Sequence, residues 1–219
     1  MTKAEYAMPT TPAPAETDHP GTTPPSGARR GRPGYDRDKL IAVCVQVFNK
    51  FGYDTTSMGT LSQHLGISKS AIYHHVNSKE EILEEALLRA LDSLEQSIDG
   101  VLATDADGVD KLEGVIRGTV RVLVEQMPYV TLLLRLRGNS EVELAALERR
   151  RRITRAVEKL VRQAQDEGSL RTDISGKSAP RLMLGMINSI VDWYHPEGQG
   201  TVEELSDTAV KMILDGLRR

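Results

Sequence analysis

Apolar residues recur at every third or fourth position from residue 36 to the end of the chain, and no segment alternates regularly between apolar and polar residues. The first spacing is that of an α-helix with one buried face, whereas alternation would indicate a half-buried β-strand. The pattern therefore predicts an all-α fold of about nine helices.

Short segments rich in Gly, Pro, Asp, Asn and Ser separate the expected helices, as is usual for connections between packed helices. The first helix is expected from about residue 36, and the second follows a cap at Thr56 or Ser57. A third helix follows Ser68, and a long fourth helix follows Ser78, which has Glu81 three residues later as in a capping box. Five further helices are expected at 109–126, 128–136, 140–167, 175–194 and 202–217.

The N-terminal segment has a different composition. Residues 1–28 are dominated by Pro, Thr, Ala, Gly and Ser and contain almost no large apolar side chains. Such a segment cannot bury enough surface to offset the entropy of ordering, so we expect a disordered tail at residues 1–34. The tail ends in the basic sequence ARRGRPG, in which Arg30 and Arg32 are candidates for contacts to DNA phosphates or the minor groove. A purely solubilising basic patch is the alternative.

The net charge of -3 hides a difference between two parts of the chain. Between positions 29 and 80 there are eight Lys and Arg residues and four Asp and Glu residues, whereas the rest of the chain is acidic. A basic module on an acidic body is compatible with nucleic-acid binding by the module alone.

Cysteine content and hydropathy bear on the compartment. The single cysteine, Cys44, excludes an intramolecular disulfide, is compatible with a reducing environment, and lies on the apolar stripe of the first helix, which favours core packing over reactivity. The sequence has neither a run of about 18 apolar residues nor the pattern of a signal peptide. We therefore expect a soluble, cytoplasmic protein without a membrane partner.

The segment LGISKSAIYHHVNSKEEIL combines short polar side chains, lysines and histidines beside a mainly apolar helix. Two short helices joined by a tight glycine-containing turn are the parts of a helix-turn-helix, whose second helix enters the major groove of DNA. Because Ile72 must point into the core, Lys69 and Tyr73 are expected to point outward. We therefore predict a three-helix DNA-binding domain at residues 35–80.

The longer stretch FGYDTTSMGTLSQHLGISKSAIYHHVNSKEEIL, residues 51–83, resembles the signature of the tetracycline-repressor (TetR) family of bacterial transcriptional regulators. The Phe-Gly-Tyr approach, the Thr/Ser cap, the GISKS turn, IYHH and SKEE occur together at the spacings typical of that family. The resemblance implies DNA contacts by Ser57, Ser68, Lys69, Ser70, Ala71, Tyr73, His74 and Lys79.

Two positions depart from the family pattern. Val76 stands where a large aromatic residue is usual, so we expect looser packing beneath the recognition helix. Ala71 offers only a methyl group, which suits contact with a thymine methyl.

Simpler explanations exist for several of these residues. Ser68 and Ser78 would be needed as helix caps in a protein that never touched DNA. Neighbouring residues on a helix point about 100° apart, so His74 and His75 are poorly placed to share one metal ion. The sequence therefore predicts no metal site and no cofactor.

A single short recognition helix reads few bases, so we expect a homodimer that presents two such helices. The helix expected at 175–194 carries apolar residues on more than one face, and together with the final helix at 202–217 it is predicted to form a four-helix bundle with the partner subunit. Completion of the monomer core is the alternative. Residues 81–219 are accordingly expected to form a ligand-binding and dimerisation domain.

The middle helices carry apolar residues that could line a ligand cavity or fill a solid core. Cations stand beside them, including the run at 149–152, and could bind an anion at the mouth of a pocket. The alternative, which we favour, is pairing of these arginines with Glu141, Glu143 and Glu148. The residues expected at a ligand site are Arg121, Met127, Leu133, Arg137, Met186 and Trp193.

A second stretch, DWYHPEGQGTVEELSD at residues 192–207, resembles the end of the ligand domain in TetR proteins that sense acyl-coenzyme A thioesters. The resemblance implies a ligand with an apolar acyl part and a phosphate-bearing part. An apolar tunnel flanked by arginines would suit such a ligand.

Two other classes of protein compete with this interpretation. No nucleophile motif, metal-ligand spacing or phosphate loop supports an enzyme, and no catalytic residue is predicted. An architectural DNA-binding protein would not need a large acidic body. The sequence therefore predicts a ligand-responsive transcriptional regulator, a homodimeric repressor of an inverted-repeat DNA operator released by a small-molecule inducer such as an acyl-CoA.

Overall fold

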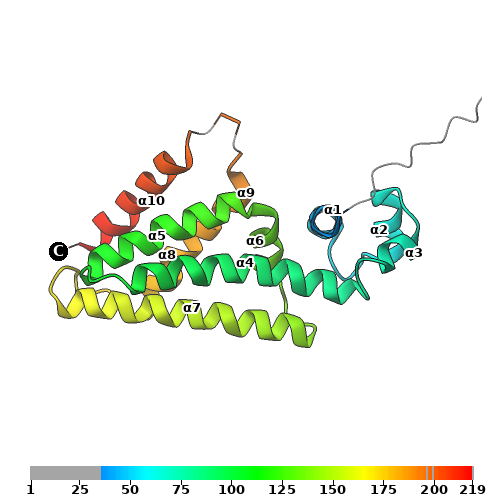
Figure 1. The fold of residues 1–219 in the computed structure, drawn as a ribbon. Coiled ribbons are helices and arrows are strands. Elements are labelled where there is room, and N and C mark those ends of the chain that lie inside the picture. Colours follow the sequence, from blue (N-terminus) through cyan, green and yellow to red (C-terminus); the bar gives the residue numbers. More distant parts are fainter. Residues whose placement is uncertain (1–35, 196, 199, 219) are drawn as a thin grey trace, which may run out of the picture. The chain divides into compact units, whose positions relative to one another are not determined.

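A computed structural model describes residues 36–195, 197, 198 and 200–218. The expected basic arm with Arg30 and Arg32 lies outside these residues. Regular secondary structure in the described part is helical, apart from one antiparallel bridge between Leu170 and Arg218 (Figure 1). The all-α prediction is confirmed.

Ten helices follow one another in the described residues, and they correspond to the nine expected segments because the segment expected at 175–194 is divided in two. They are α1 (Arg37–Phe51), α2 (Met58–Leu65), α3 (Lys69–Tyr73), α4 (Lys79–Leu102), α5 (Gly108–Glu125), α6 (Met127–Leu134), α7 (Glu141–Asp166), α8 (Ser178–Asn188), α9 (Ile190–Trp193) and α10 (Val202–Leu217). In this described part, no helix is long and apolar enough to cross a membrane.

Serine side chains start α2, α3 and α4. The hydroxyl oxygens of Ser57, Ser68 and Ser78 each accept a hydrogen bond from the backbone N–H three residues later, at 3.1, 3.1 and 3.0 Å. Each bond satisfies a donor that the first turn of a helix leaves without a partner. The capping box expected at Ser78 is half formed, because the Glu81 carboxylate accepts from the backbone N–H of Asn77 instead.

Two helices differ from their expected extent. The third ends at Tyr73, where the chain tightens and the N–H of His75 donates to the carbonyl of Ile72 at 2.9 Å. The segment expected at 175–194 is divided at Ser189, whose hydroxyl donates to the carbonyl of Met186 at 2.7 Å. A serine hydroxyl that bonds the backbone in this way competes with helix continuation.

The short helix α3 is attached to its neighbours by apolar burial. Ile72 and Val76 are 0% and 1% exposed, so the position where the family usually has an aromatic residue lies within the core. The guanidinium of Arg37, at the start of α1, pairs with Glu81 and Glu85 of α4 at 2.7 and 2.6 Å. These partly exposed ion pairs join the ends of two helices, although each contributes about 1 kcal/mol at most.

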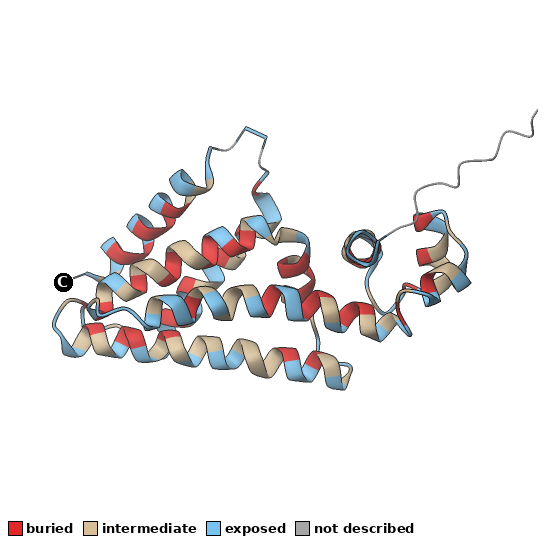
Figure 2. Cartoon of the chain, viewed as in Figure 1, coloured by how far each residue is buried: buried red, intermediate tan, exposed pale blue. Residues whose placement is uncertain are grey.

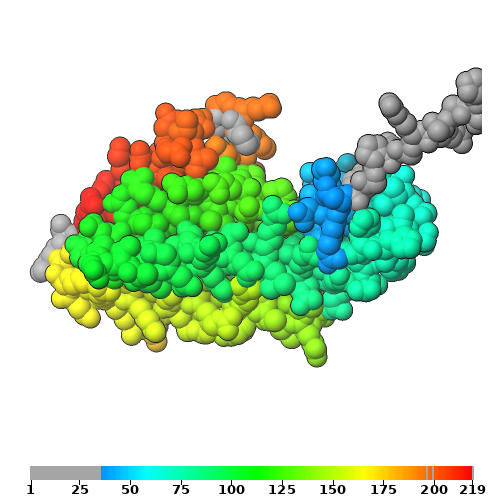
Figure 3. Space-filling model, viewed as in Figure 1, coloured from blue at the N-terminus to red at the C-terminus, as the bar shows by residue number. Residues whose placement is uncertain are grey.

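The helix α5 lies at the centre of the remaining helices and packs against α4, α7 and α10 (Figure 1). Its buried side chains include Leu112, Ile116, Val120 and Leu123. Buried residues recur along α4, α5 and α10 in a helical stripe, with exposed residues on the opposite face (Figure 2). Side chains of α4 and α7 meet along their shared face, which helps to close this core (Figure 3).

Cys44 belongs to the core, as expected. Its side chain is 0% exposed, and burial raises the pKa of the thiol to about 12. The thiol is therefore protonated near neutral pH, which is unfavourable for nucleophilic chemistry.

Glu143 is a buried carboxylate with a structural role. It is 4% exposed, and one of its oxygens accepts hydrogen bonds from the backbone N–H groups of Arg137, Gly138 and Asn139 at 3.0, 2.8 and 3.2 Å. These donors belong to the connection between α6 and α7, and the hydrogen bonds are partly buried, so loss of the carboxylate would leave the three N–H groups without this partner. Glu143 therefore fixes the path of that connection.

We predict that Glu143→Ala lowers the free energy of unfolding by about 1 to 3 kcal/mol, because it removes three partly buried hydrogen bonds to a charged group. Urea denaturation followed by circular dichroism measures the change. Glu141→Ala is the matched control, since Glu141 is exposed in the first turn of the same helix and should cost less than about 1 kcal/mol. Equal losses for the two variants would contradict this role.

Candidate nucleic-acid interface and effector cavity

The outer face of α3 is polar and open to solvent. Ser68, Lys69, Ser70 and His74 are exposed, and Tyr73 keeps 50% of its surface accessible. Because Ile72 points into the core, the side chains on the opposite side of α3 point to solvent. The predicted recognition residues of α3 and its two ends thus share one exposed face, apart from Ala71, which is half-buried on the same helix.

The turn between α2 and α3 brings the two helices close together. Gly66 ends α2 with φ of 65°, in the left-handed region that favours glycine. The side chain of Lys69 extends over α2, where its Cε would lie 3.2 Å from a Cβ placed on Gly59. Ser57, exposed at the start of α2, hydrogen-bonds its hydroxyl to that of Thr60 at 3.1 Å. The start of α2 and the outer face of α3 therefore present hydroxyl and amino groups together.

Lys79 has a partner within the chain. Its ammonium donates to the backbone carbonyl of Tyr53 at 2.9 Å and lies 4.2 Å from the centroid of the Tyr53 ring. These contacts offset the unfavourable position of a cation in the first turn of α4. An ammonium group has three donors, so the carbonyl alone does not exhaust its capacity for hydrogen bonds.

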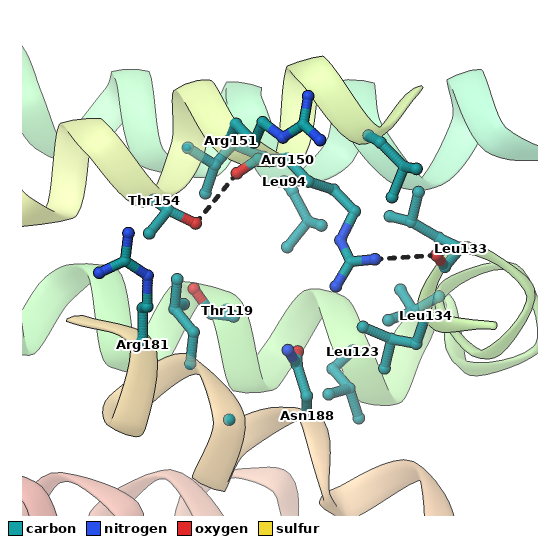
Figure 4. Close-up of a pocket in the computed structure, with 15 residues that line it drawn as sticks. Leu94, Thr119, Leu123, Leu133, Leu134, Arg150, Arg151, Thr154, Arg181 and Asn188 are labelled. Carbon is teal, nitrogen blue, oxygen red and sulfur yellow. Dashed lines mark hydrogen bonds between the residues drawn. The ribbon is translucent and has the colours of Figure 1, made fainter. Parts of the chain in front are cut away.

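A cavity of about 350 Å³ lies among α4, α5, α6, α7 and α8 (Figure 4). Most of its wall is apolar and consists of Leu94, Leu123, Val130, Leu133, Leu134, Leu147, Ile153 and Leu184. Polar groups enter from three helices, with Thr119 on α5, Arg150, Arg151 and Thr154 on α7, and Arg181 and Asn188 on α8. Figure 4 shows the side chain of Arg150 extending into the space between α7 and α6.

The arginines of α7 have different partners. Arg149 pairs with Asp92 and Glu95 of α4 at 2.5 and 2.7 Å, and not with the glutamates expected from the sequence. Arg151 pairs with Glu148 at 3.3 Å, as expected. Arg150 donates to the backbone carbonyl of Leu133 at 3.3 Å, and none of the ion pairs found among the described residues involves it.

Of the residues expected at a ligand site, the structure brings Leu133 to this cavity. Arg121 is exposed on α5, Met127 is half-buried at the start of α6, and Arg137 borders a separate hollow beside α1. Met186 and Trp193 are exposed on α8 and α9. These side chains point elsewhere because each helix turns its residues by about 100° per position, and apolar character alone does not say which face meets a cavity.

Sequence reasoning did not select Arg150, Arg181, Thr119 or Asn188. The run of arginines at 149–152 was the available signal, but the sequence did not say which of its members has an acidic partner. Only the packing of α4 against α7 assigns those partners, since Asp92 and Glu95 are more than fifty residues away in sequence.

A second hollow, of about 600 Å³, lies between the end of α1 and the connection from α6 to α7. Here Asn49 donates from its side-chain amide to the carbonyl of Pro128 at 2.7 Å, and Arg135 donates to the backbone carbonyl of Asn49. The side-chain oxygen of Asn49 is buried and has no hydrogen-bond partner among the described residues. The helix α6 thus contacts α1 on one side and lines the cavity of about 350 Å³ on the other.

Comparison with known families assigns the class of the protein. Residues 40–86 match the family described as bacterial regulatory proteins, tetR family, and residues 105–217 match the tetracyclin repressor-like C-terminal domain. Together the two matches cover more than half of the chain, so the chain belongs to the TetR family of bacterial transcriptional regulators. The predicted resemblance and the regulatory class are confirmed, and the enzyme alternative is not supported.

Individual relatives agree with this assignment. A TetR-family regulator of known structure from Streptomyces coelicolor is 46% identical, with a TM-score of 0.75 and coverage of 82% of this chain and 91% of that protein. The repressor KstR2 of Rhodococcus jostii is 25% identical over 90% of this chain and 97% of its own length. AibR, solved in complex with isovaleryl coenzyme A and operator DNA, is 22% identical with a TM-score of 0.68 and coverage of 80% and 96%.

Proposed function

We propose that the protein is a homodimeric repressor that binds an inverted-repeat operator and is released from it by a small molecule. Residues 35–80 would form the DNA-binding domain and residues 81–219 the ligand-binding and dimerisation domain. The observation that carries the proposal is the exposed polar face of α3, held in place by the burial of Ile72. An exposed row of hydroxyl, amino and imidazole groups suits the phosphates and base edges of a major groove.

The residues proposed to contact DNA are those of α3 and its surroundings: Ser57, Ser68, Lys69, Ser70, Ala71, Tyr73, His74 and Lys79. The exposure of Lys69 and Tyr73 supports direct contacts. Lys79 would reach a phosphate with donors that Tyr53 does not occupy. The basic arm, with Arg30 and Arg32, stays a prediction because it lies outside the described residues.

We predict that Lys69→Ala and Tyr73→Ala weaken operator binding. Removal of a base contact should cost about 1 to 3 kcal/mol of binding free energy. Removal of a phosphate contact should lower the slope of log K against log salt concentration by about 1. Duplexes selected from a random library with the parent protein are titrated by fluorescence anisotropy at several salt concentrations. Lys159→Ala is the matched control, because this lysine is exposed on α7 and should leave binding unchanged.

Parent-like binding by both α3 variants would refute the assignment of this helix. The same titration separates a repressor from an architectural protein. Equal affinity for selected and scrambled duplexes would favour the architectural alternative, because sequence-independent binding arises from phosphate contacts alone.

The proposed dimer interface consists of the outward faces of α8 and α10, both of which pack against α5. Leu182 and Met212 are 71% and 63% exposed in a single chain, and Met186 is 41% exposed. No atom lies within 4 Å of a Cβ placed on Gly185 or Gly216, so a second helix could approach both positions closely. A second copy of the chain would cover these faces in a four-helix bundle.

We predict that Leu182→Glu and Met212→Glu shift the protein from dimer to monomer, because a carboxylate would be buried in an apolar interface. Sedimentation velocity measures the effect, and operator affinity should fall in parallel. Leu144→Glu serves as the control, since Leu144 is 53% exposed on α7, outside the proposed interface. A dimer that persists in both variants would require an interface elsewhere.

The inducer is proposed to occupy the cavity beside Arg150 and to be an acyl-CoA thioester. Support comes from the apolar wall of the cavity and its arginines, and from the isovaleryl coenzyme A bound by the relative AibR. A ligand in the cavity could affect the DNA-binding helices through α6. Val130 and Leu133 of this helix line the cavity. Pro128 accepts a hydrogen bond from the Asn49 side chain of α1, and Arg135 donates one to the Asn49 carbonyl.

We predict that an acyl-CoA inducer weakens operator binding by a factor of about 5 to 150, and that operator weakens inducer binding equally, as linkage requires. Arg135→Ala should reduce this factor while leaving both separate affinities close to those of the parent, because it removes a contact between α6 and α1. Anisotropy titrations with and without isovaleryl-CoA and octanoyl-CoA provide the factor. Arg121→Ala is the control, and an unchanged factor in Arg135→Ala would exclude this route.

A further inference from the structure

The effector cavity carries an unbalanced positive charge. Three of its lining residues are arginines, namely Arg150, Arg151 and Arg181, and the lining contains no Asp or Glu. Arg151 has Glu148 as a partner outside the lining, and Arg181 is exposed. Arg150 is therefore the cation whose charge is least compensated inside the cavity.

The hydrogen-bond partners of Arg150 also show that its positive charge has no nearby carboxylate in the described part of the chain. Its neighbour Arg149 has two carboxylate partners, whereas the one hydrogen bond found for the Arg150 side chain goes to the neutral carbonyl of Leu133 (Figure 4). A guanidinium has five N–H donors in a fork that matches an oxyanion with two bonds. Because one hydrogen bond to the protein is found for this side chain among the described residues, most of these donors remain available to a ligand in the cavity.

Burial lowers the pKa of Arg150 from its ordinary value. A guanidinium stays protonated even so, and the lowered pKa reflects a charge that has lost water without gaining a counter-ion. An anion that entered the cavity would supply the missing partner. The position is thus electrostatically prepared for a negatively charged ligand group.

The other polar groups of the cavity are less suited to an anion. The hydroxyls of Thr119 and Thr154 donate to the carbonyls of Val115 and Arg150 at 2.7 and 3.1 Å, so they present lone pairs to the cavity. The side-chain amide of Asn188 reaches into the same space from α8 (Figure 4) and can donate. An anion would therefore lie nearer to the Arg150 guanidinium than to either threonine.

We infer that the effector consists of an apolar body that bears an oxyanion, and that Arg150 binds this oxyanion inside the cavity. The inference rests on the proposed function for the assignment of the cavity as the effector site. Two sources share this chemistry: the carboxylate of a free organic acid and a phosphate of an acyl thioester.

The size and wall of the cavity limit the apolar body. Small-molecule sites generally have volumes of about 300 to 1,000 Å³, and this cavity lies at the lower end with about 350 Å³. A compact hydrocarbon chain or ring fits that description. Leucine side chains from α4, α5, α6, α7 and α8 surround it and would exclude water from the ion pair with Arg150.

The test compares ligands that differ only in charge. Straight-chain alkanoates of four to twelve carbons and the alkanols of equal length are titrated into the full-length protein, with calorimetry and thermal shift as readouts. We expect at least one alkanoate to bind about 10- to 100-fold more tightly than its alkanol, the factor associated with a hydrogen bond to a charged group. Equal affinity for the two series, or absence of alkanoate binding together with octanoyl-CoA binding that Arg150→Gln leaves unchanged, would overturn the inference.

Variants of Arg150 identify the residue responsible. Arg150→Gln should remove the preference for alkanoates, whereas Arg150→Lys should retain a part of it because the charge is kept. Arg152→Gln is the matched control, because Arg152 belongs to the same arginine run, is exposed, and is absent from the cavity lining. Retention of the full preference in Arg150→Gln would overturn the role of this residue, and the melting temperature of each variant establishes that it is folded.

Coenzyme A and octanoyl-CoA form the remaining arms. A loss of octanoyl-CoA binding in Arg150→Gln, with weak binding of the alkanoates to the parent, assigns the phosphate as the source. The reverse result assigns the free carboxylate. Operator binding without ligand is measured for every variant, so failure of the proposed repressor function, seen as no specific DNA binding, is distinguished from failure of the anion preference.

Discussion

The position of α3, and with it the polar face proposed to contact DNA, depends on the burial of Ile72. An isolated helix of five residues is unstable in water, because the cost of nucleation is not recovered over so short a length. The apolar contact of Ile72, together with the cap at Ser68, holds α3 in place and at the same time turns its polar side chains to solvent. The surface that would meet DNA is thus a direct consequence of the core beneath it.

Burial of apolar side chains also holds the C-terminal helices together, but there it is incomplete and leaves a cavity. Around α5 the helices bury apolar side chains almost everywhere, yet between α6, α7 and α8 they leave a cavity into which one arginine extends without a carboxylate partner. Arg150 is half-buried and has no carboxylate partner among the described residues, and this arrangement supports its proposed contact with an anionic ligand. Because α6 borders both this cavity and α1, a change at the ligand would reach the DNA-binding helices through packed contacts over a short distance.

The relatives with 22 and 25% identity match this chain over most of their length. At that level of identity two proteins share a fold, but the residues that line their cavities can differ. The chemistry of the proposed effector therefore depends on the side chains of this chain, above all on Arg150. The DNA-binding class, in contrast, follows from family membership.

The helices, their serine caps and the outward polar face of α3 were predictable from the amino-acid sequence, because they depend on periodicity and on residues a few positions apart. The end of α2 at Gly66 and the caps at Ser57 and Ser68 could be predicted for the same reason. The residues that line the cavity, and the pairing that leaves Arg150 without a carboxylate partner, depend on the packing of the helices, because Arg149 pairs with acids of α4 more than fifty residues earlier. The tertiary structure likewise shows that Met186 and Trp193 lie on exposed faces. Periodicity states that a helix has a buried side, but only the packing of several helices decides what that side touches.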